Sequence, residues 1–235
     1  MKHHMFFSLI ESLLTRSNSF TGSSLASRAK RIAALQRELD GIRDEGQKQR
    51  RFDGLPERDQ RMLDALWGQL FSDRGRKNIP TSGGRWTGEP GDSLWIPDDN
   101  VIPPDKGYSN MHGKTWRQIK AENGFQGINF NDGRADFRPV SKADVVFDWE
   151  RELGKEGIRH IVETGDRQYL HEAGFALLAK NMGKSVWEVK DFKESENLVW
   201  HEEPDCQTLR LVVREVHDII RHFGGVAMLA IVFEG

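Results

Sequence analysis

The sequence predicts an α+β fold with a strand–turn–strand–helix unit near the C terminus. This unit is embedded in a mostly helical domain, and a helical hairpin precedes that domain. Apolar residues recur every three or four positions along much of the chain, which is the spacing of a helix with one buried face. Near the end, apolar runs at residues 198–200 and 209–213 flank a polar turn, which predicts two paired strands.

Residues 1–80 are predicted to form a helical extension and linker. A short apolar helix is expected at the start of the chain, followed by a Ser/Thr/Gly-rich linker at residues 17–24. Apolar spacing then predicts a hairpin of two helices over residues 24–73, the first fading at 47–51 and the second starting at Pro56. We interpret this hairpin as a connector or small cap, with dedicated DNA binding as the alternative.

Residues 81–235 are predicted to form the second domain. Glycines and prolines break any regular element over residues 75–113, and short strands are expected around an Asp-Gly turn at 132–133. Further on, a helix from Asp166 to about Lys180 should end at Gly183, and Ser185 should cap the next one. Four tryptophans are expected to be buried, three on helices and one beneath the strand pair: Trp116, Trp149, Trp187 and Trp200.

Charge and composition limit the possible classes of function. Net charge is -2, but residues 1–80 carry 15 Lys and Arg against 10 Asp and Glu, whereas residues 140–235 carry 12 against 18. This imbalance argues against tight non-specific DNA binding by the C-terminal part alone. We find no apolar run of about 18 residues that would suggest a membrane span, and no secretory signal. The chain has one cysteine, Cys206, so no intrachain disulfide can form.

Three histidines stand out by their positions around the predicted strand pair. His201 ends the first strand, while His217 and His222 follow the second. Five positions is a poor fit to one helical face, so the helix should end before His222, and Gly224 and Gly225 agree with an early stop. Phosphodiester cleavage needs a proton acceptor for water and a cation for the developing negative charge. Imidazoles can supply the first and hold the second.

The pieces that carry a resemblance follow one another in order: Trp200-His201-Glu202, the strand at 209–213, Arg214-Glu215-Val216-His217, and His222-Phe223-Gly224-Gly225. Residues 91–97, 113–116 and 132–137 extend it upstream. With these pieces the chain resembles the HNH (ββα-metal or His-Me finger) nucleases, in the branch of bacterial polymorphic toxins that begins Trp-His-His or Trp-His-Glu. The resemblance covers roughly residues 85–225, with the ββα core at about 197–225.

The resemblance implies roles for individual residues. His201 is our candidate general base, oriented by a backbone carbonyl of the facing strand, and His217 and His222 are candidate metal ligands. Glu202 stands where many relatives have histidine, and it is a candidate third ligand. The alternative is that Glu202 is the base and His201 a ligand, because successive strand residues point to opposite faces. Arg214 and Arg221 are candidate phosphate contacts, or helix-surface ion pairs.

Together these features predict a metal-dependent endonuclease that hydrolyses DNA with little sequence preference. One divalent ion is expected, whether Mg²⁺, Mn²⁺, Ni²⁺ or Zn²⁺. The resemblance implies a toxin used against competing bacteria, delivered by a contact- or secretion-system-dependent route to the target-cell cytoplasm, and neutralised by a cognate immunity protein. The alternatives are a degenerate ββα metal-binding interaction module without nuclease activity, and an RNA-directed nuclease.

Overall fold

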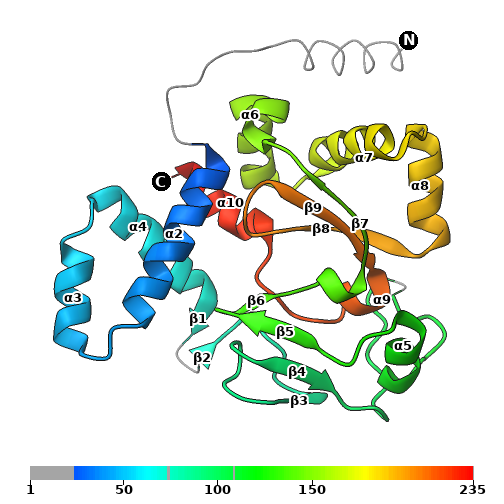
Figure 1. The fold of residues 1–235 in the computed structure, drawn as a ribbon, viewed down its shortest axis with the longest axis horizontal. Helices are drawn as coiled ribbons and strands as arrows, with labels where there is room; N and C mark the ends of the chain where they lie inside the picture. Colours follow the sequence, from blue (N-terminus) through cyan, green and yellow to red (C-terminus); the bar gives the residue numbers. More distant parts are fainter. Residues whose placement is uncertain (1–23, 73–74, 108, 235) are drawn as a thin grey trace.

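The computed structural model describes residues 24–72, 75–107 and 109–234. It confirms the α+β class: two small antiparallel sheets lie one above the other, and helices surround them on three sides (Figure 1). The apolar helix and most of the linker expected at the start of the chain lie outside the described residues. Within the described part, every helix is too short or too polar to cross a membrane.

The N-terminal helical region contains three helices where two were expected: α2 (Leu25–Asp40), α3 (Glu45–Asp53) and α4 (Glu57–Leu70). The predicted first helix is broken after Asp40, where the N–H of Gly41 donates to the Arg37 carbonyl and the N–H of Ile42 donates to the Leu39 carbonyl. The Asp44 carboxylate then accepts from the N–H of Gln47 at 2.6 Å and starts α3. The prediction of an uninterrupted first helix was therefore wrong.

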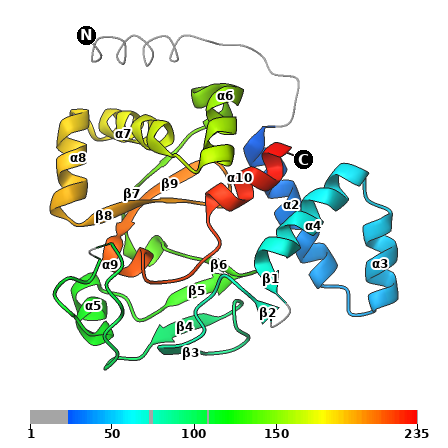
Figure 2. The ribbon, with the colours of Figure 1, turned by 180° about the vertical axis from the view of Figure 1, so that it is seen from behind.

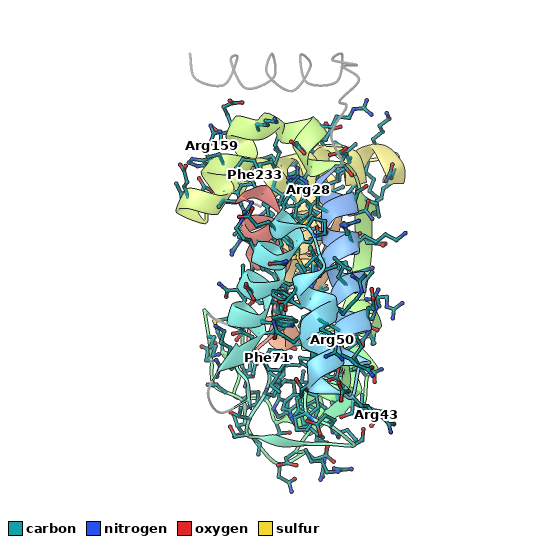
Figure 3. The ribbon with its side chains drawn as sticks, turned by 90° about the vertical axis from the view of Figure 1, so that its left-hand side faces the viewer. Arg28, Arg43, Arg50, Phe71, Arg159 and Phe233 are labelled. Carbon is teal, nitrogen blue, oxygen red and sulfur yellow. The ribbon has the colours of Figure 1, made fainter. Side chains whose placement is uncertain are left out.

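The apolar C-terminal residues form a further helix, α10 (Gly225–Glu234), which packs back onto α2, α4 and α6. This helix lies between the N-terminal helices and the upper sheet in both ribbon views (Figures 1 and 2). The Arg28 guanidinium of α2 donates to the carbonyl of Val232 at 2.8 Å, and Arg28 lies beside Phe233 in Figure 3. The two ends of the described chain thus share one core. The domain boundary at residue 80 stays a prediction.

The lower sheet has the order β3-β4-β5-β6. Its strands are β3 (Gly84–Trp86), β4 (Leu94–Pro97), β5 (Ile128–Asn131) and β6 (Arg134–Ala135), and a separate pair, β1 (Phe71–Ser72) and β2 (Gly75–Arg76), precedes them. The turn between β5 and β6 is confirmed, with positive φ at Asp132 and Gly133. The expectation of no regular element in residues 75–113 was wrong. Position 84 of β3 requires glycine, because a Cβ there would lie only 2.6 Å from the Ile96 carbonyl oxygen of β4.

The upper sheet has the order β7-β9-β8, with β7 (Ser141–Val146), β8 (Leu198–Glu202) and β9 (Thr208–Val213). The pairing of β8 with β9 confirms the prediction from sequence, whereas β7 was not predicted. Helices α6 (Trp149–Thr164), α7 (Gln168–Met182), α8 (Val186–Ser195) and α9 (Arg214–His217) and the 3-10 turn Arg138–Val140 flank this sheet. Helix α5 (Trp116–Asn123) lies beside the lower sheet (Figure 1), where Trp116 packs edge-on against Trp95 of β4. The stop at Gly183 and the Ser185 capping box are both confirmed.

Helix α7 packs closely on the β8–β9 hairpin. A Cβ at Gly174 would lie 2.7 Å from Leu209 Cδ1, so a larger residue there would force the Leu209 side chain to shift. Trp116, Trp149 and Trp200 are buried as expected. Trp187 was expected in the core but is 71 % exposed. Val189 is the buried residue of helix α8. Trp187 is two positions earlier and therefore points to the opposite, exposed side of the helix.

Candidate active site

The β8–β9 hairpin sets the frame of the site. Its turn is closed by the Asp205 carboxylate, which accepts from the backbone N–H groups of Gln207 and Thr208 at 3.0 and 2.9 Å. Cys206 is buried in this turn, and burial raises the pKa of its thiol, so it behaves as an inert packing residue. Asp205 and Cys206 therefore both stabilise the turn between the two strands.

The three histidines singled out from the sequence meet at one point. His201 is on β8, His217 is the last residue of α9, and His222 lies in the following loop. One ligand nitrogen from each ring can be chosen so that all lie within 4.8 Å of one another. Helix α9 ends before His222, as predicted. The chain that follows can therefore turn back and bring His222 toward β8.

The Phe137 ring packs against all three histidine rings of this cluster. Its centroid lies 4.8 Å from those of His201 and His222 and 5.4 Å from that of His217. Phe137 itself is fully buried and precedes the 3-10 turn Arg138–Val140. Because the buried Phe137 ring cannot move freely, its contacts restrict the rotamers of all three imidazoles. The cluster is therefore preorganised by packing.

Hydrogen bonds fix two of the rings. His217 Nδ1 lies 2.9 Å from Asp218 Oδ1, and His222 Nδ1 lies 2.8 Å from the Ile220 carbonyl oxygen. Both partners are acceptors, so each Nδ1 carries the proton and each Nε2 keeps its lone pair. The Nε2 of His217 faces His201 Nδ1 at 3.2 Å. Two of the three imidazoles therefore present an unprotonated nitrogen to the centre of the cluster.

His201 differs from what the sequence suggested. Its side chain is 1 % exposed, and no backbone carbonyl orients it. Its Nδ1 faces His217, and its Nε2 is buried without a hydrogen-bond partner among the described residues, 3.9 Å from Glu203 Oε2. The expected carbonyl contact was wrong, because one ring nitrogen faces His217 and the other has no hydrogen-bond partner among the described residues.

Burial keeps the His201 and His222 side chains neutral. It lowers the pKa of His201 well below its ordinary value, and the neighbouring His222 and His217 lower it further. Burial, with the His217 charge, likewise lowers the pKa of His222 to about 4. These imidazoles are thus unprotonated at neutral pH, which is the form that binds a metal ion.

Glu202 is not a member of this cluster, but it lies close enough that its charge partly offsets the lowering of the His222 pKa, and its carboxylate contacts α7. Its Oε1 is 2.7 Å from His171 Nε2 and 3.7 Å from Arg167 Nε. Burial favours the neutral carboxyl, but the hydrogen bond from His171 and the charges of His171 and Arg167 together lower its pKa. The group of nitrogens within 4.8 Å contains the three histidines and not Glu202.

His171 is not among the candidate site residues predicted from the sequence. It is one of a set of α7 residues at spacings of three, four and seven that face the hairpin, namely His171, Gly174, Phe175 and Leu178. That spacing could have placed it on the buried side of the helix. Its partner on β8 was beyond sequence reasoning, because the two residues are 31 positions apart.

The two candidate phosphate contacts lie near the histidines along the chain but differ in surroundings. Arg214 donates to the Leu198 carbonyl at 3.4 Å and lies 3.9 Å from Asp218, so its guanidinium is partly engaged. Arg221 is exposed on the loop between His217 and His222. Their role toward phosphate stays a prediction.

The metal-free protein should lose stability on acidification from about pH 6.5 to about pH 4. His222 has a folded-state pKa of about 4, below the 6.5 of a free imidazole. In this window the unfolded chain binds a proton that the folded chain does not, so the free energy of unfolding falls by roughly 2 kcal/mol at pH 5 from this side chain. Urea unfolding with chelator at about pH 7.5 and pH 5 measures the loss. A His222→Gln variant should lose less, and equal losses would contradict the assignment.

The comparisons with known proteins fall on this region. Residues 128–224 match the model of a family described as the DNase/tRNase domain of colicin-like bacteriocins. The matched segment begins at β5 and contains all three histidines, Glu202 and His171. No curated protein and no solved structure gives a significant match to the chain.

Proposed function

We propose that the protein is a metal-dependent endonuclease, because residues 128–224 match the model of the DNase/tRNase domain of colicin-like bacteriocins. Its substrate is DNA, which it cuts with little sequence preference. The observation that carries this proposal is the buried cluster of His201, His217 and His222, with ligand nitrogens within 4.8 Å. A structural role alone gives no reason to bury three imidazoles against one another.

The donor set fits one divalent ion. Imidazole is a common ligand of Zn²⁺ and Ni²⁺, and two nitrogens that share one tetrahedral ion lie about 3.3 Å apart. The distance from His201 Nδ1 to His217 Nε2 is 3.2 Å. We therefore assign His201, His217 and His222 as the ligands. A bound ion would act as a Lewis acid on the scissile phosphate.

This assignment adopts the second of the two alternatives open from the sequence, in which His201 is a ligand and Glu202 the base. Two features support it. His201 is buried with its Nδ1 directed into the cluster, whereas Glu202 is held ionised by His171 and Arg167. His171 and Arg167 both approach Oε1, so Oε2 is the oxygen that remains to accept a proton from water.

The biological setting follows from the family. A colicin-type nuclease domain belongs to a toxin that acts in target cells. We propose delivery by a contact- or secretion-dependent route and neutralisation by an immunity protein of the producing cell. The acidic balance of residues 140–235 suits an immunity partner with a basic surface.

Metal-stimulated cleavage of plasmid DNA is the expected result for the purified protein. Supercoiled plasmid and total RNA are incubated separately with Mg²⁺, Mn²⁺, Ni²⁺ or Zn²⁺, with excess chelator as the control. Cleavage of DNA that stops with chelator supports the proposal. Cleavage of RNA alone would instead support the alternative function, an RNA-directed nuclease. Metal binding without cleavage of either nucleic acid would show a degenerate module and overturn the enzyme proposal.

A further inference from the structure

The pairing of His171 with Glu202 joins two parts of the chain that the ββα core alone would not connect. His171 is in the first turn of α7, and Glu202 is the last residue of β8. The distance between His171 Nε2 and Glu202 Oε1 is 2.7 Å, the length of a charge-assisted hydrogen bond. Side-chain exposure is 28 % for His171 and 11 % for Glu202, so solvent screens the contact only in part.

Packing holds His171 in this position. Its ring lies 6.3 Å from that of Trp200, which is itself packed edge-on against Phe175 at 5.2 Å. Gly174, one turn further along α7, allows the helix to approach Leu209 of β9. Helix α7 therefore rests on β8 and β9 through residues on the same face as His171. A contact so supported is a fixed feature of the fold.

We propose that His171 is a positioning residue of the nuclease site, which holds the Glu202 carboxylate through the Nε2–H···Oε1 hydrogen bond and fixes Oε2 as the oxygen that faces water. An ionised carboxylate can only accept, so the imidazole is the donor. Fixing one oxygen removes rotational freedom that the base would otherwise lose on reaching the transition state. This inference rests on the proposed function, because it gives Glu202 the role of base.

His171 also borders a cavity of about 580 Å³ between α7 and α8. Arg167, Lys190 and Lys193 contribute cationic side chains to it. Lys190 is paired with Glu172 and Lys193 with Glu194, whereas Arg167 lies 3.7 Å from Glu202 itself. Arg167 thus gives the same carboxylate oxygen a second, longer-range cationic neighbour, and its removal should weaken the positioning less than loss of His171.

Steady-state cleavage of a DNA duplex tests this positioning role. With the metal that best supports the parent protein, His171→Ala should lower kcat by about 10- to 100-fold, as expected when a supporting partner is lost, with little change in KM. His171→Gln keeps an N–H at a similar distance from Cα and should recover much of that loss. Metal affinity, measured by calorimetry, should be the same in all variants. The matched control is His160→Ala, an exposed histidine on neighbouring α6, which should retain parental kcat.

A second measurement does not depend on activity. Side-chain ¹⁵N NMR of the metal-free protein should show His171 protonated on Nε2, and this signal should change in Glu202→Ala but not in His160→Ala. A bare Nε2, or a parental kcat in His171→Ala, would overturn the inference. Equal kcat losses in the Ala and Gln variants would assign the effect to packing and overturn it as well. Absence of cleavage by the parent protein would instead overturn the proposed function, and this inference with it.

Discussion

Replacing His217 by alanine should abolish metal-dependent cleavage and lower the affinity for divalent metal by more than about 100-fold. Loss of a supporting residue commonly costs about 10- to 100-fold in metal affinity, and loss of one of three direct ligands should cost more. His217 is suited to the test because its Nε2 faces His201 and its Nδ1 is held by Asp218. Calorimetric titration with Zn²⁺ and plasmid cleavage measure the two effects.

Two further variants provide comparisons for the metal affinity of His217→Ala. Asp218→Asn keeps His217 but replaces the carboxylate that orients it, so the metal affinity should fall by an intermediate amount, about 10- to 100-fold. His112→Ala removes an exposed histidine and should bind metal as the parent does. If His217→Ala binds Zn²⁺ as tightly as His112→Ala, the three-histidine site does not exist in solution.

Replacing Gly225 by alanine should destabilise the protein by about 2–3 kcal/mol, although alanine is the better helix former. Gly225 is the first residue of α10, and a Cβ there would lie 2.4 Å from the Glu203 carbonyl oxygen and 2.8 Å from that of Glu202. These are backbone atoms of the hairpin and cannot rotate away. The helix or the hairpin must shift, and Glu202 shifts with the latter. Urea denaturation gives the change in the free energy of unfolding.

The adjacent glycine provides the control. A Cβ at Gly224 would approach only His222 side-chain atoms, at 3.9 Å, which is ordinary contact. Gly224→Ala in the metal-free protein should therefore keep the parental free energy of unfolding within about 0.5 kcal/mol. Equal destabilisation by the two substitutions would contradict the close contact between α10 and the hairpin. Activity should fall further in Gly225→Ala than in Gly224→Ala, since only the first displaces the Glu202 backbone.

Local patterns in the sequence were sufficient for much of the fold near the site. The β8–β9 pair, the Asp132-Gly133 turn, the Ser185 capping box and the stop of α9 before His222 were all predicted, because each depends on residues within a few positions of one another. The break at Gly41, the strands β3 and β4 and the exposure of Trp187 were not. The break at Gly41 follows from local caps that the apolar spacing does not show, whereas the strands and the exposure of Trp187 depend on which neighbour a segment meets in space.

The same division applies to the site. The amino-acid sequence by itself determined that His201, His217 and His222 belong together, because their order around a strand pair and a short helix leaves few other uses for them. Only the tertiary structure decided toward which face of β8 the side chains of His201 and Glu202 each point. Successive strand residues point in opposite directions, and only packing against Phe137 on one face and α7 on the other shows which direction leads to which neighbours. Sequence patterns carry no information on a contact that spans 31 residues, such as that between His171 and Glu202.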